Sequence, residues 1–200
     1  MMKLREYSIL DSADAAQVAE YEHHFYHAYN GLAGNNLVRQ LWDWDDAGQR
    51  LKTRIPYCDQ VIYAWRDLCG RLLIAMAVNV NCGRAFQGAA FGFTPQADAT
   101  GRGAEQSCEI LNVMATANHR ASARASYRDF IRDFGYADLK SRGFEIAYST
   151  CTRRRLRPYL RLGATLLAEN AIQGEERFFL AWPVREATPG PRSPALAVRE

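Results

Sequence analysis

Apolar positions along this chain fall into short runs separated by polar and glycine-containing turns. Seven runs are rich in β-branched and other apolar residues and have the length of typical strands. The expected strands are residues 5–10, 60–65, 71–81, 108–115, 145–151, 165–172 and 177–184. A short segment ending in Gly70 separates the second and third runs and predicts a hairpin, and the last two runs predict another. The run 108–115 is almost continuously apolar, so we expect a central strand covered on both faces.

Four segments have apolar residues at the spacing of an amphipathic helix. The expected helices are residues 15–31, 36–44, 125–142 and 154–162. Asp11 or Ser12 can cap the first helix with a short acceptor side chain, and Gly163 is placed to end the last one. Gly135 lies inside the third helix and costs about 1 kcal/mol relative to alanine there. Because strands and helices alternate in the second half, we expect an α/β (α+β) fold with a mixed sheet and helices on its faces.

Length and composition fit one globular unit. The chain has 200 residues, of which 48% are hydrophobic and 24% are charged, and this balance argues against disorder as the main state. We expect a single domain over residues 1–184. Residues 185–200 contain three prolines and scattered small residues, and we expect them to form a disordered tail.

Charge and hydropathy exclude several classes of function. The formal net charge of +3 is too small to mark a nucleic-acid-binding protein. The longest apolar run, residues 72–80, is about half the length needed to cross a bilayer, and charges near the N-terminus argue against a signal peptide. We therefore expect a cytoplasmic protein with no membrane span. Five arginines between residues 153 and 161 would suit a phosphate group or an acidic partner, or form a solvated helix face.

Cysteine and histidine residues give little support for disulfides or a metal site. The five cysteines are odd in number and none forms a C-x-x-C pair, so we expect reduced and mostly buried thiols. His23 and His27 are one helical turn apart, but no H-E-x-x-H motif surrounds them. A metal pair there is geometrically allowed, whereas a solvated or substrate-facing helix surface is the simpler interpretation. We expect no metal.

A candidate phosphate-binding segment follows the strand 108–115. His119–Ala125 is rich in small residues, which let a backbone approach phosphates closely, and it precedes an expected helix. Free amide groups and the helix dipole at such a position attract a pyrophosphate. Arg120 and Arg124 add charged hydrogen-bond donors. The alternative is an ordinary helix start with solvated arginines.

Three segments of the second half resemble the GNAT superfamily of N-acyltransferases, and the similarity spans residues 60–184. Cys108–Met114 resembles the central fourth strand of that family, and Pro158–Ala164 resembles its FYxxLGF segment. His119–Ala125 occupies the place of the family's pyrophosphate loop, R/Q-x-x-G-x-G/A, with alanine in the first glycine position. The resemblance implies a GNAT-like fold, in which a mixed, mostly antiparallel central sheet is flanked by helices on both faces.

The resemblance implies an acyltransferase that uses an acyl thioester, either acyl-CoA or acyl carrier protein, as donor. The amine of a small acceptor attacks the acyl carbonyl, a tetrahedral intermediate forms and a thiolate leaves. Tyr159 matches the tyrosine that often protonates the departing sulfur; otherwise it is a core aromatic residue. Glu109 lies on the strand that often supplies the base; otherwise it is a structural carboxylate with an ion-pair partner. A backbone amide near Met114 or Ala115 would polarise the thioester carbonyl.

A set of donor-binding residues follows from the same resemblance. They are Val113, Met114, Ala115, His119, Arg120, Ser122, Ala123, Arg124 and Ala125. The acidic residues Asp43, Asp45, Asp46 and Asp59 are candidates for recognising a cationic acceptor, or belong to a solvated face. Many proteins of this superfamily are dimers, so a homodimer is an open alternative.

The first 60 residues favour a narrower alternative to a general N-acyltransferase, namely one particular branch of the superfamily. The segment 40–46 and the aromatic first helix resemble acyl-homoserine-lactone synthases and N-acyl amino acid synthases, which take acyl chains from acyl carrier protein. The arginine signature of the lactone synthases is not clearly present. A second alternative is a non-catalytic GNAT-like binding domain, which the alanine in the pyrophosphate loop favours.

Overall fold

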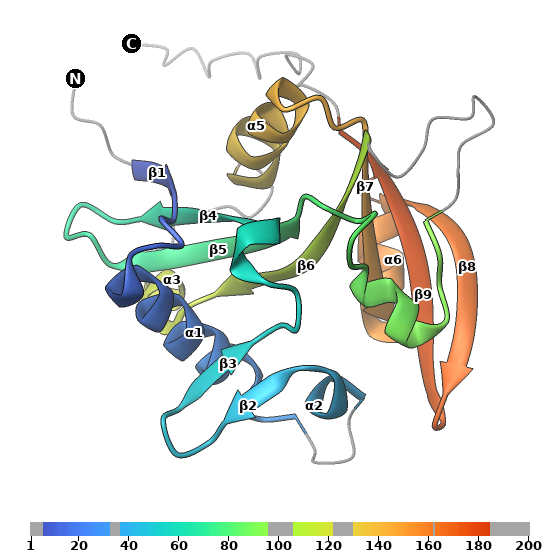
Figure 1. Ribbon diagram of the computed structural model, residues 1–200, viewed down its shortest axis with the longest axis horizontal. Coiled ribbons are helices and arrows are strands. Elements are labelled where there is room, and N and C mark those ends of the chain that lie inside the picture. Colours follow the sequence, from blue (N-terminus) through green and yellow to red (C-terminus); the bar gives the residue numbers. More distant parts are fainter. Residues whose placement is uncertain (1–5, 33–36, 96–105, 122–129, 162, 185–200) are drawn as a thin grey trace, which may run out of the picture.

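A large mixed sheet forms the centre of the computed structural model, which describes residues 6–32, 37–95, 106–121, 130–161 and 163–184 (Figure 1). Its strands are β1 (Glu6–Ile9), β4 (Gln60–Arg66), β5 (Leu72–Asn79), β6 (Ser107–Ala115), β7 (Ile146–Thr152), β8 (Thr165–Ile172) and β9 (Glu175–Pro183). They lie in the order β1-β4-β5-β6-β7-β9-β8. Neighbouring strands are antiparallel except β6 and β7, which run parallel.

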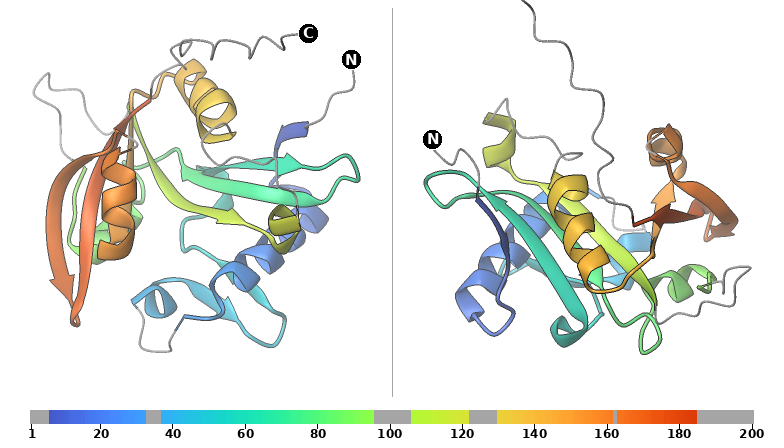
Figure 2. Two further views of the ribbon diagram at one scale, coloured as in Figure 1. Left: turned by 180° about the vertical axis from the view of Figure 1, so that it is seen from behind. Right: turned by 90° about the horizontal axis from the view of Figure 1, so that it is seen from above.

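Helices cover both faces of this sheet (Figure 2). They are α1 (Ala15–Tyr29), α2 (Leu37–Leu41), η1 (Tyr57–Asp59), η2 (Gln87–Phe91), α3 (Ala117–Ala121), the π-helix η4 (Ile131–Gly135), α5 (Tyr136–Ser141) and α6 (Arg153–Arg161). A small separate hairpin consists of β2 (Asp43–Asp45) and β3 (Arg50–Lys52). The arrangement confirms the expected mixed, mostly antiparallel sheet between helices.

Apolar side chains of the central strands alternate between two cores. On one face Leu111 and Met114 of β6 pack in the same cluster as Phe25 of α1. On the other face Cys108 packs in a cluster with Phe130, at the start of the helical segment that leads into α5. We call these surfaces the α1 face and the α5 face. The strand expected over residues 108–115 is central, as predicted, because β5 and β7 flank it and both of its faces are covered.

The start of α1 differs from the expectation. Asp14 caps this helix in place of Asp11 or Ser12, and its carboxylate accepts a hydrogen bond from the Ala16 N–H at 2.9 Å. The carboxylate of Asp11 instead accepts a hydrogen bond from the Ala13 N–H at 2.9 Å and closes a turn. Each of these short acidic side chains satisfies the nearest free N–H groups, so the cap is the last of them before the helix begins.

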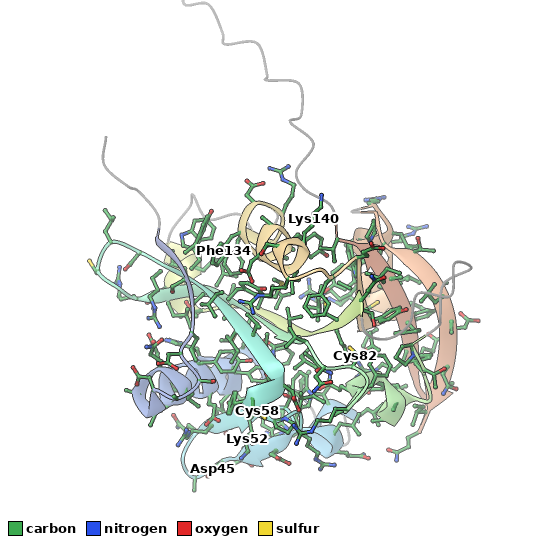
Figure 3. The ribbon with its side chains drawn as sticks, turned by 45° about the horizontal axis from the view of Figure 1, so that its top comes forward. Asp45, Lys52, Cys58, Cys82, Phe134 and Lys140 are labelled. Atoms are coloured by element: carbon green, nitrogen blue, oxygen red, sulfur yellow. The ribbon has the colours of Figure 1, made fainter. Side chains whose placement is uncertain are left out.

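The segment 36–44 was expected to be helical throughout, and this is wrong. Among its described residues, 37–44, only the five of α2 are helical, and the chain then enters the β2–β3 hairpin. Oδ1 of Asp45 accepts a hydrogen bond from the Gly48 N–H at 2.8 Å and closes the connecting turn. Figure 3 labels Asp45 and Lys52 on this hairpin. A strand of three residues is too short to show an alternating pattern, so no local pattern predicted this hairpin.

The helix expected over residues 125–142 is present in its described part, and residues 122–129 lie outside the described residues. The helix contains one π-helical turn, η4, before α5 begins. Gly135 ends that turn in close contact with β5, where a Cβ atom would lie 2.3 Å from Cε of Met76. Close approach to the sheet therefore explains a glycine that helix propensity alone disfavours.

The C-terminal elements follow the expectation. Gly163, with φ of +95°, ends α6, and Gln173 and Gly174 form the β8–β9 turn with positive φ angles of 50° and 81°. The expected tail, residues 185–200, lies outside the described residues. Within the described ranges, none of the helices is both long and apolar enough to cross a lipid bilayer.

Candidate active site

The parallel strands β6 and β7 separate soon after they meet. They pair at three positions, of which the last is Glu109↔Tyr148, and then diverge (Figure 1). We call the region between the two strands beyond this pair the β6–β7 fork. Along residues 110–115 the edge of β6 that faces the fork therefore has no strand paired with it in the described structure.

A β-bulge in β6 lies at the start of the fork. Ile110 and Asn112 face two consecutive residues of β5, so Leu111 is the extra residue. Bulges bend a strand and increase its local twist. After the bulge, Val113 packs on the α5 face, whereas Leu111 lies in the core of the α1 face.

The hydrogen-bond ladder determines which N–H groups of β6 point into the fork. The Thr116 N–H donates to the Leu73 carbonyl at 2.9 Å and so points toward β5. Because N–H direction alternates along a strand, the Met114 N–H points toward β5 as well, whereas those of Val113 and Ala115 point to the open edge. The sequence analysis indicated the backbone amides of Met114 and Ala115 as candidates for binding the thioester carbonyl. The Ala115 N–H points into the fork, whereas the Met114 N–H points toward β5.

Two tyrosines lie on the α5 face. Tyr159 of α6 packs edge-on against Trp182 with ring centroids 5.4 Å apart, and the Trp182 indole N–H donates to Ser149 Oγ at 2.9 Å. Burial raises the pKa of Tyr159 above its ordinary value. Burial also raises the pKa of Tyr136 of α5, with smaller contributions from Cys108 and Tyr159. The sequence analysis missed Tyr136, whose place beside Tyr159 depends on the packing of α5.

Glu109 is buried at the closed end of the fork, with 1% of its surface exposed. Its two carboxylate oxygens accept hydrogen bonds from the N–H groups of Gln87 and Gly88, both at 2.8 Å, at the start of η2. Asn79 Nδ2 lies 3.5 Å from the carboxylate. Burial raises the pKa of Glu109 to about 7, and the two backbone hydrogen bonds oppose this shift. Among the described residues its partners are backbone and amide N–H groups rather than a cationic side chain.

The proposed phosphate segment is described only in part. It was expected to be a loop, but its first residues already belong to α3, which includes the backbone of Arg120. Thr116 Oγ1 donates to the Leu72 carbonyl at 2.6 Å and holds the start of α3 against β5. His119 is half-buried in this helix. The remaining predicted residues, Ser122, Ala123, Arg124 and Ala125, lie outside the described residues, so phosphate binding stays a prediction.

The arginines of α6 form an exposed basic surface. Arg153 pairs with Glu176 of β9 through a 2.6 Å hydrogen bond. The other four have no ion-pair partner within the described residues, and all are exposed. They are Arg154, Arg155, Arg157 and Arg161. We call these four residues the α6 basic surface.

The acidic residues proposed for a cationic acceptor are mostly paired within the chain. Three of the four carboxylates have arginine partners: Asp43–Arg54 (3.2 Å), Asp46–Arg39 (3.1 Å) and Asp59–Arg84 (3.3 Å). A cavity of about 250 Å³ beside the β2–β3 hairpin is lined by both signs of charge, including Glu22, Asp45, Arg50 and Lys52. The set therefore does not form one negative centre.

The three histidines of α1 contact one another through His23, whose ring centroid lies 5.9 Å from that of His24. His23 and His27 stack edge-on with ring centroids 4.4 Å apart. In the part of the chain that the structure describes, no group of three or more histidine, cysteine, aspartate or glutamate residues is arranged to hold a metal ion.

Comparison with known proteins identifies the architecture. No protein-family model and no curated protein matches the sequence. Among solved structures, the CoA-dependent acyl-homoserine lactone synthase BjaI has a TM-score of 0.61 at 10% identity, over 90% of this chain and 84% of that one. FeeM, an N-acyl amino acid synthase from uncultured soil microbes, has a TM-score of 0.56 at 10% identity, over 90% of both chains. The ribosomal-protein-S18-alanine N-acetyltransferase from Escherichia coli has a TM-score of 0.54 at 10% identity, over 92% and 97%.

The chain has the GNAT fold. At these identities the likeness establishes the arrangement of elements, and donor and acceptor have to be argued from this chain's own residues. Within the GNAT fold β6 is the central strand that the sequence indicated at residues 108–114.

Proposed function

We propose that this protein is an N-acyltransferase that moves an acyl group from an acyl thioester to the amine of a small acceptor. The observation that carries the proposal is a GNAT fold with an open β6 edge, where the N–H groups of Val113 and Ala115 point into the fork. Such groups donate to a carbonyl oxygen whose negative charge grows in the tetrahedral intermediate. Synthases and acetyltransferases of the same fold support this class of reaction.

The donor, with acyl-CoA as the simplest candidate, is assigned to the α5 face of the fork. Half-buried Ile110 and Val113 offer an apolar surface there. When the amine attacks, a C–N bond forms, the C–S bond breaks and the thiolate takes a proton. Tyr159 is the proposed donor of that proton, and its raised pKa keeps the phenol protonated at neutral pH. Its alternative role is as a packing partner of Trp182.

Glu109 is the proposed base for the proton that the amine loses. With a pKa of about 7 it is about half ionised near neutral pH, which suits a general base. Both oxygens already accept backbone N–H groups, so proton transfer to Glu109 requires an intervening water. The alternative is that Glu109 only fastens η2 to β6.

Substitution of the phenol tests the proposed chemistry. We expect Tyr159→Phe to lower the turnover number by about 100-fold, because the thiolate would leave unprotonated. The dissociation constant for coenzyme A should stay within twofold, and Tyr136→Phe, on the same face, should keep most of the activity. Steady-state thiol release and equilibrium binding of coenzyme A are the two measurements. Full turnover in Tyr159→Phe would remove this residue from the mechanism.

An acyl carrier protein is a second candidate for the donor. The observation that favours it is the α6 basic surface, since four exposed arginines without internal partners complement an acidic protein. The same surface would also suit the 3′-phosphate of coenzyme A, so the choice of donor is an outcome for experiment.

A further inference from the structure

Ser149 of β7 has a hydroxyl proton for which the described residues offer no acceptor. The Trp182 indole N–H donates to Ser149 Oγ at 2.9 Å. An indole can only donate, so Ser149 is the acceptor in this bond and its own O–H is not used. Ser149 is 6% exposed, and within the described ranges no other hydrogen bond engages its side chain. Because buried polar groups are normally paired, this free donor points to a ligand.

The position of Ser149 is the closed end of the fork. The last pair between β6 and β7 is Glu109↔Tyr148, so Ser149 is the first residue of β7 after the two strands separate. Side chains alternate along a strand, and Ser149 therefore shares a face with Ala147, which packs in the core of the α5 face. Ile110, the residue of β6 that follows Glu109, packs on the same face. The hydroxyl thus lies on the face to which the donor is assigned.

Tyr159 lies close to Ser149 on this face. The helix α6 covers β7 and β9 there (Figure 2). Leu180 of β9 pairs with Ser149 and belongs to the buried cluster against which Tyr159 packs. Trp182, which holds Ser149 through its N–H, also contacts the ring of Tyr159, with ring centroids 5.4 Å apart. One indole therefore touches both hydroxyl-bearing residues, and the two border the same small region.

We propose that Ser149 is a further catalytic residue, which donates a hydrogen bond to the sulfur atom of the thioester donor, and that Trp182 is its positioning residue. This inference rests on the proposed acyl transfer. When the C–S bond breaks, its electron pair goes to the sulfur, and the Ser149 O–H stabilises the growing negative charge while keeping its proton. The proton that the thiolate takes comes from Tyr159. Since the charge on sulfur is larger in the transition state than in the bound thioester, the hydrogen bond contributes to turnover.

The surroundings of Ser149 favour this role. Its neighbours on the α5 face include the apolar side chain of Leu180 and the indole of Trp182. Burial raises the pKa of Cys151, the next residue on this face of β7, to about 11, so the Cys151 thiol stays neutral and places no negative charge beside the departing sulfur. A hydrogen bond to a developing charge is stronger in such surroundings than in water.

Equilibrium binding tests the contact with sulfur without relying on turnover. The probes are coenzyme A and desulfo-coenzyme A, which has hydrogen in place of the thiol, titrated calorimetrically into the full chain at about pH 9, where a thiol is mostly ionised. The unmodified chain should prefer coenzyme A. Ser149→Ala combined with Trp182→Phe should reduce that preference by about 10-fold, the size of one hydrogen bond to a charged group. If only acyl carrier protein binds, the same comparison uses its pantetheine arm with and without the sulfur.

Three variants make this comparison specific. The double variant removes both partners of the bond between Ser149 and Trp182 and leaves no buried N–H unpaired, so it should fold normally. Trp182→Phe alone keeps the hydroxyl and an aromatic ring, and should keep most of the preference for coenzyme A. Thr150→Val removes a hydroxyl from the opposite face of β7 and is the matched control, which should behave like the unmodified chain.

Turnover gives a second readout that a purely structural role would not move. With an acyl-CoA as donor, the double variant should lower kcat by about 10-fold and change KM by less than about twofold. Ser149→Thr, which keeps the hydroxyl, should retain most of the activity. With an aryl thioester, whose more acidic thiol leaves without help, the loss in the double variant should shrink to about threefold or less.

Each outcome separates the contact with sulfur from the proposed reaction. An unchanged preference for coenzyme A in the double variant would overturn the role of Ser149, and thiol release by the unmodified chain would still support acyl transfer. Equal losses of kcat with alkyl and aryl thioesters would show that Ser149 only pairs with Trp182. A preference that depends on Ser149, without thiol release from any thioester, would contradict the proposed function while leaving the contact in place. Binding of neither donor would overturn both proposals.

Discussion

Glu109 shows how one buried carboxyl group couples the candidate site to stability. Its carboxylate fastens the start of η2 to the central strand through two backbone hydrogen bonds. Desolvation nevertheless favours the neutral form, which gives a pKa of about 7 against an ordinary value of 4.5. Folding is therefore linked to protonation of this residue whether or not it also acts as a base.

The linkage predicts a pH dependence of unfolding. Between pH 4.5 and 7 the folded state holds a proton on Glu109 that the unfolded chain has released. The contribution of Glu109 to the free energy of unfolding is therefore fully present below pH 4.5 and is lost as the pH rises through 7. The expected loss is about 3 kcal/mol in the free energy of unfolding. Urea denaturation at several pH values measures it, and Glu109→Gln should remove that part of the slope. Equal slopes for both proteins would contradict the assignment.

Residues of the candidate site differ in how far the sequence could reveal them. Glu109 was visible as a carboxylate inside an apolar strand, whereas Tyr159, which lies inside α6, was indicated only by the resemblance of its segment to the FYxxLGF segment of GNAT proteins. Tyr136 was not visible in the sequence, because its place on the α5 face depends on how α5 packs against the sheet.

At the scale of elements, local patterns predicted every strand of the large sheet, the helices α1 and α6, and the end of α5, but they missed the short helices η1, η2 and α3. They failed where a segment is too short to show a period, as in the β2–β3 hairpin, and where two acidic residues compete to cap one helix. The parallel pairing of β6 and β7 and its early end are long-range features. No local sequence pattern specifies them, because they depend on how elements far apart in the sequence pack together.

Gly135 provides a test of packing between η4 and β5. We expect Gly135→Ala to lower the free energy of unfolding by about 1 kcal/mol, because overpacking against fully buried Met76 outweighs the gain in helix propensity. Chemical denaturation measures the change. In a Met76→Val background, which lacks the atoms that the new Cβ would meet, the same substitution should no longer destabilise. An equal loss in both backgrounds would mean that the contact is not the cause.

On the scale of the whole molecule, α6 and its basic surface lie on the α5 face of the sheet, the face to which the donor is assigned. A large donor can therefore approach the fork from the α5 face without covering the α1 face.

The position of the α6 basic surface predicts for which donors the activity requires the positive charges of α6. With acyl carrier protein as donor, Arg154→Glu combined with Arg157→Glu should lower kcat/KM by about 10-fold or more, and 0.5 M salt should shrink that difference. With a short-chain N-acetylcysteamine thioester, which carries no phosphate, the same variant should match the unmodified protein. Equal losses with both donors would indicate damage to the fold rather than a docking surface.

Thiol release tests the central claim most directly. The protein would be mixed with acetyl-CoA, a long-chain acyl-CoA or acyl carrier protein, each with and without a panel of amino acids and amines. Free thiol and product mass would be followed together. The account predicts amine-dependent thiol release from at least one donor, with an amide of matching mass formed in equal amount. Donor binding without thiol release above background, across the whole panel, would show instead a non-catalytic GNAT-fold binding domain.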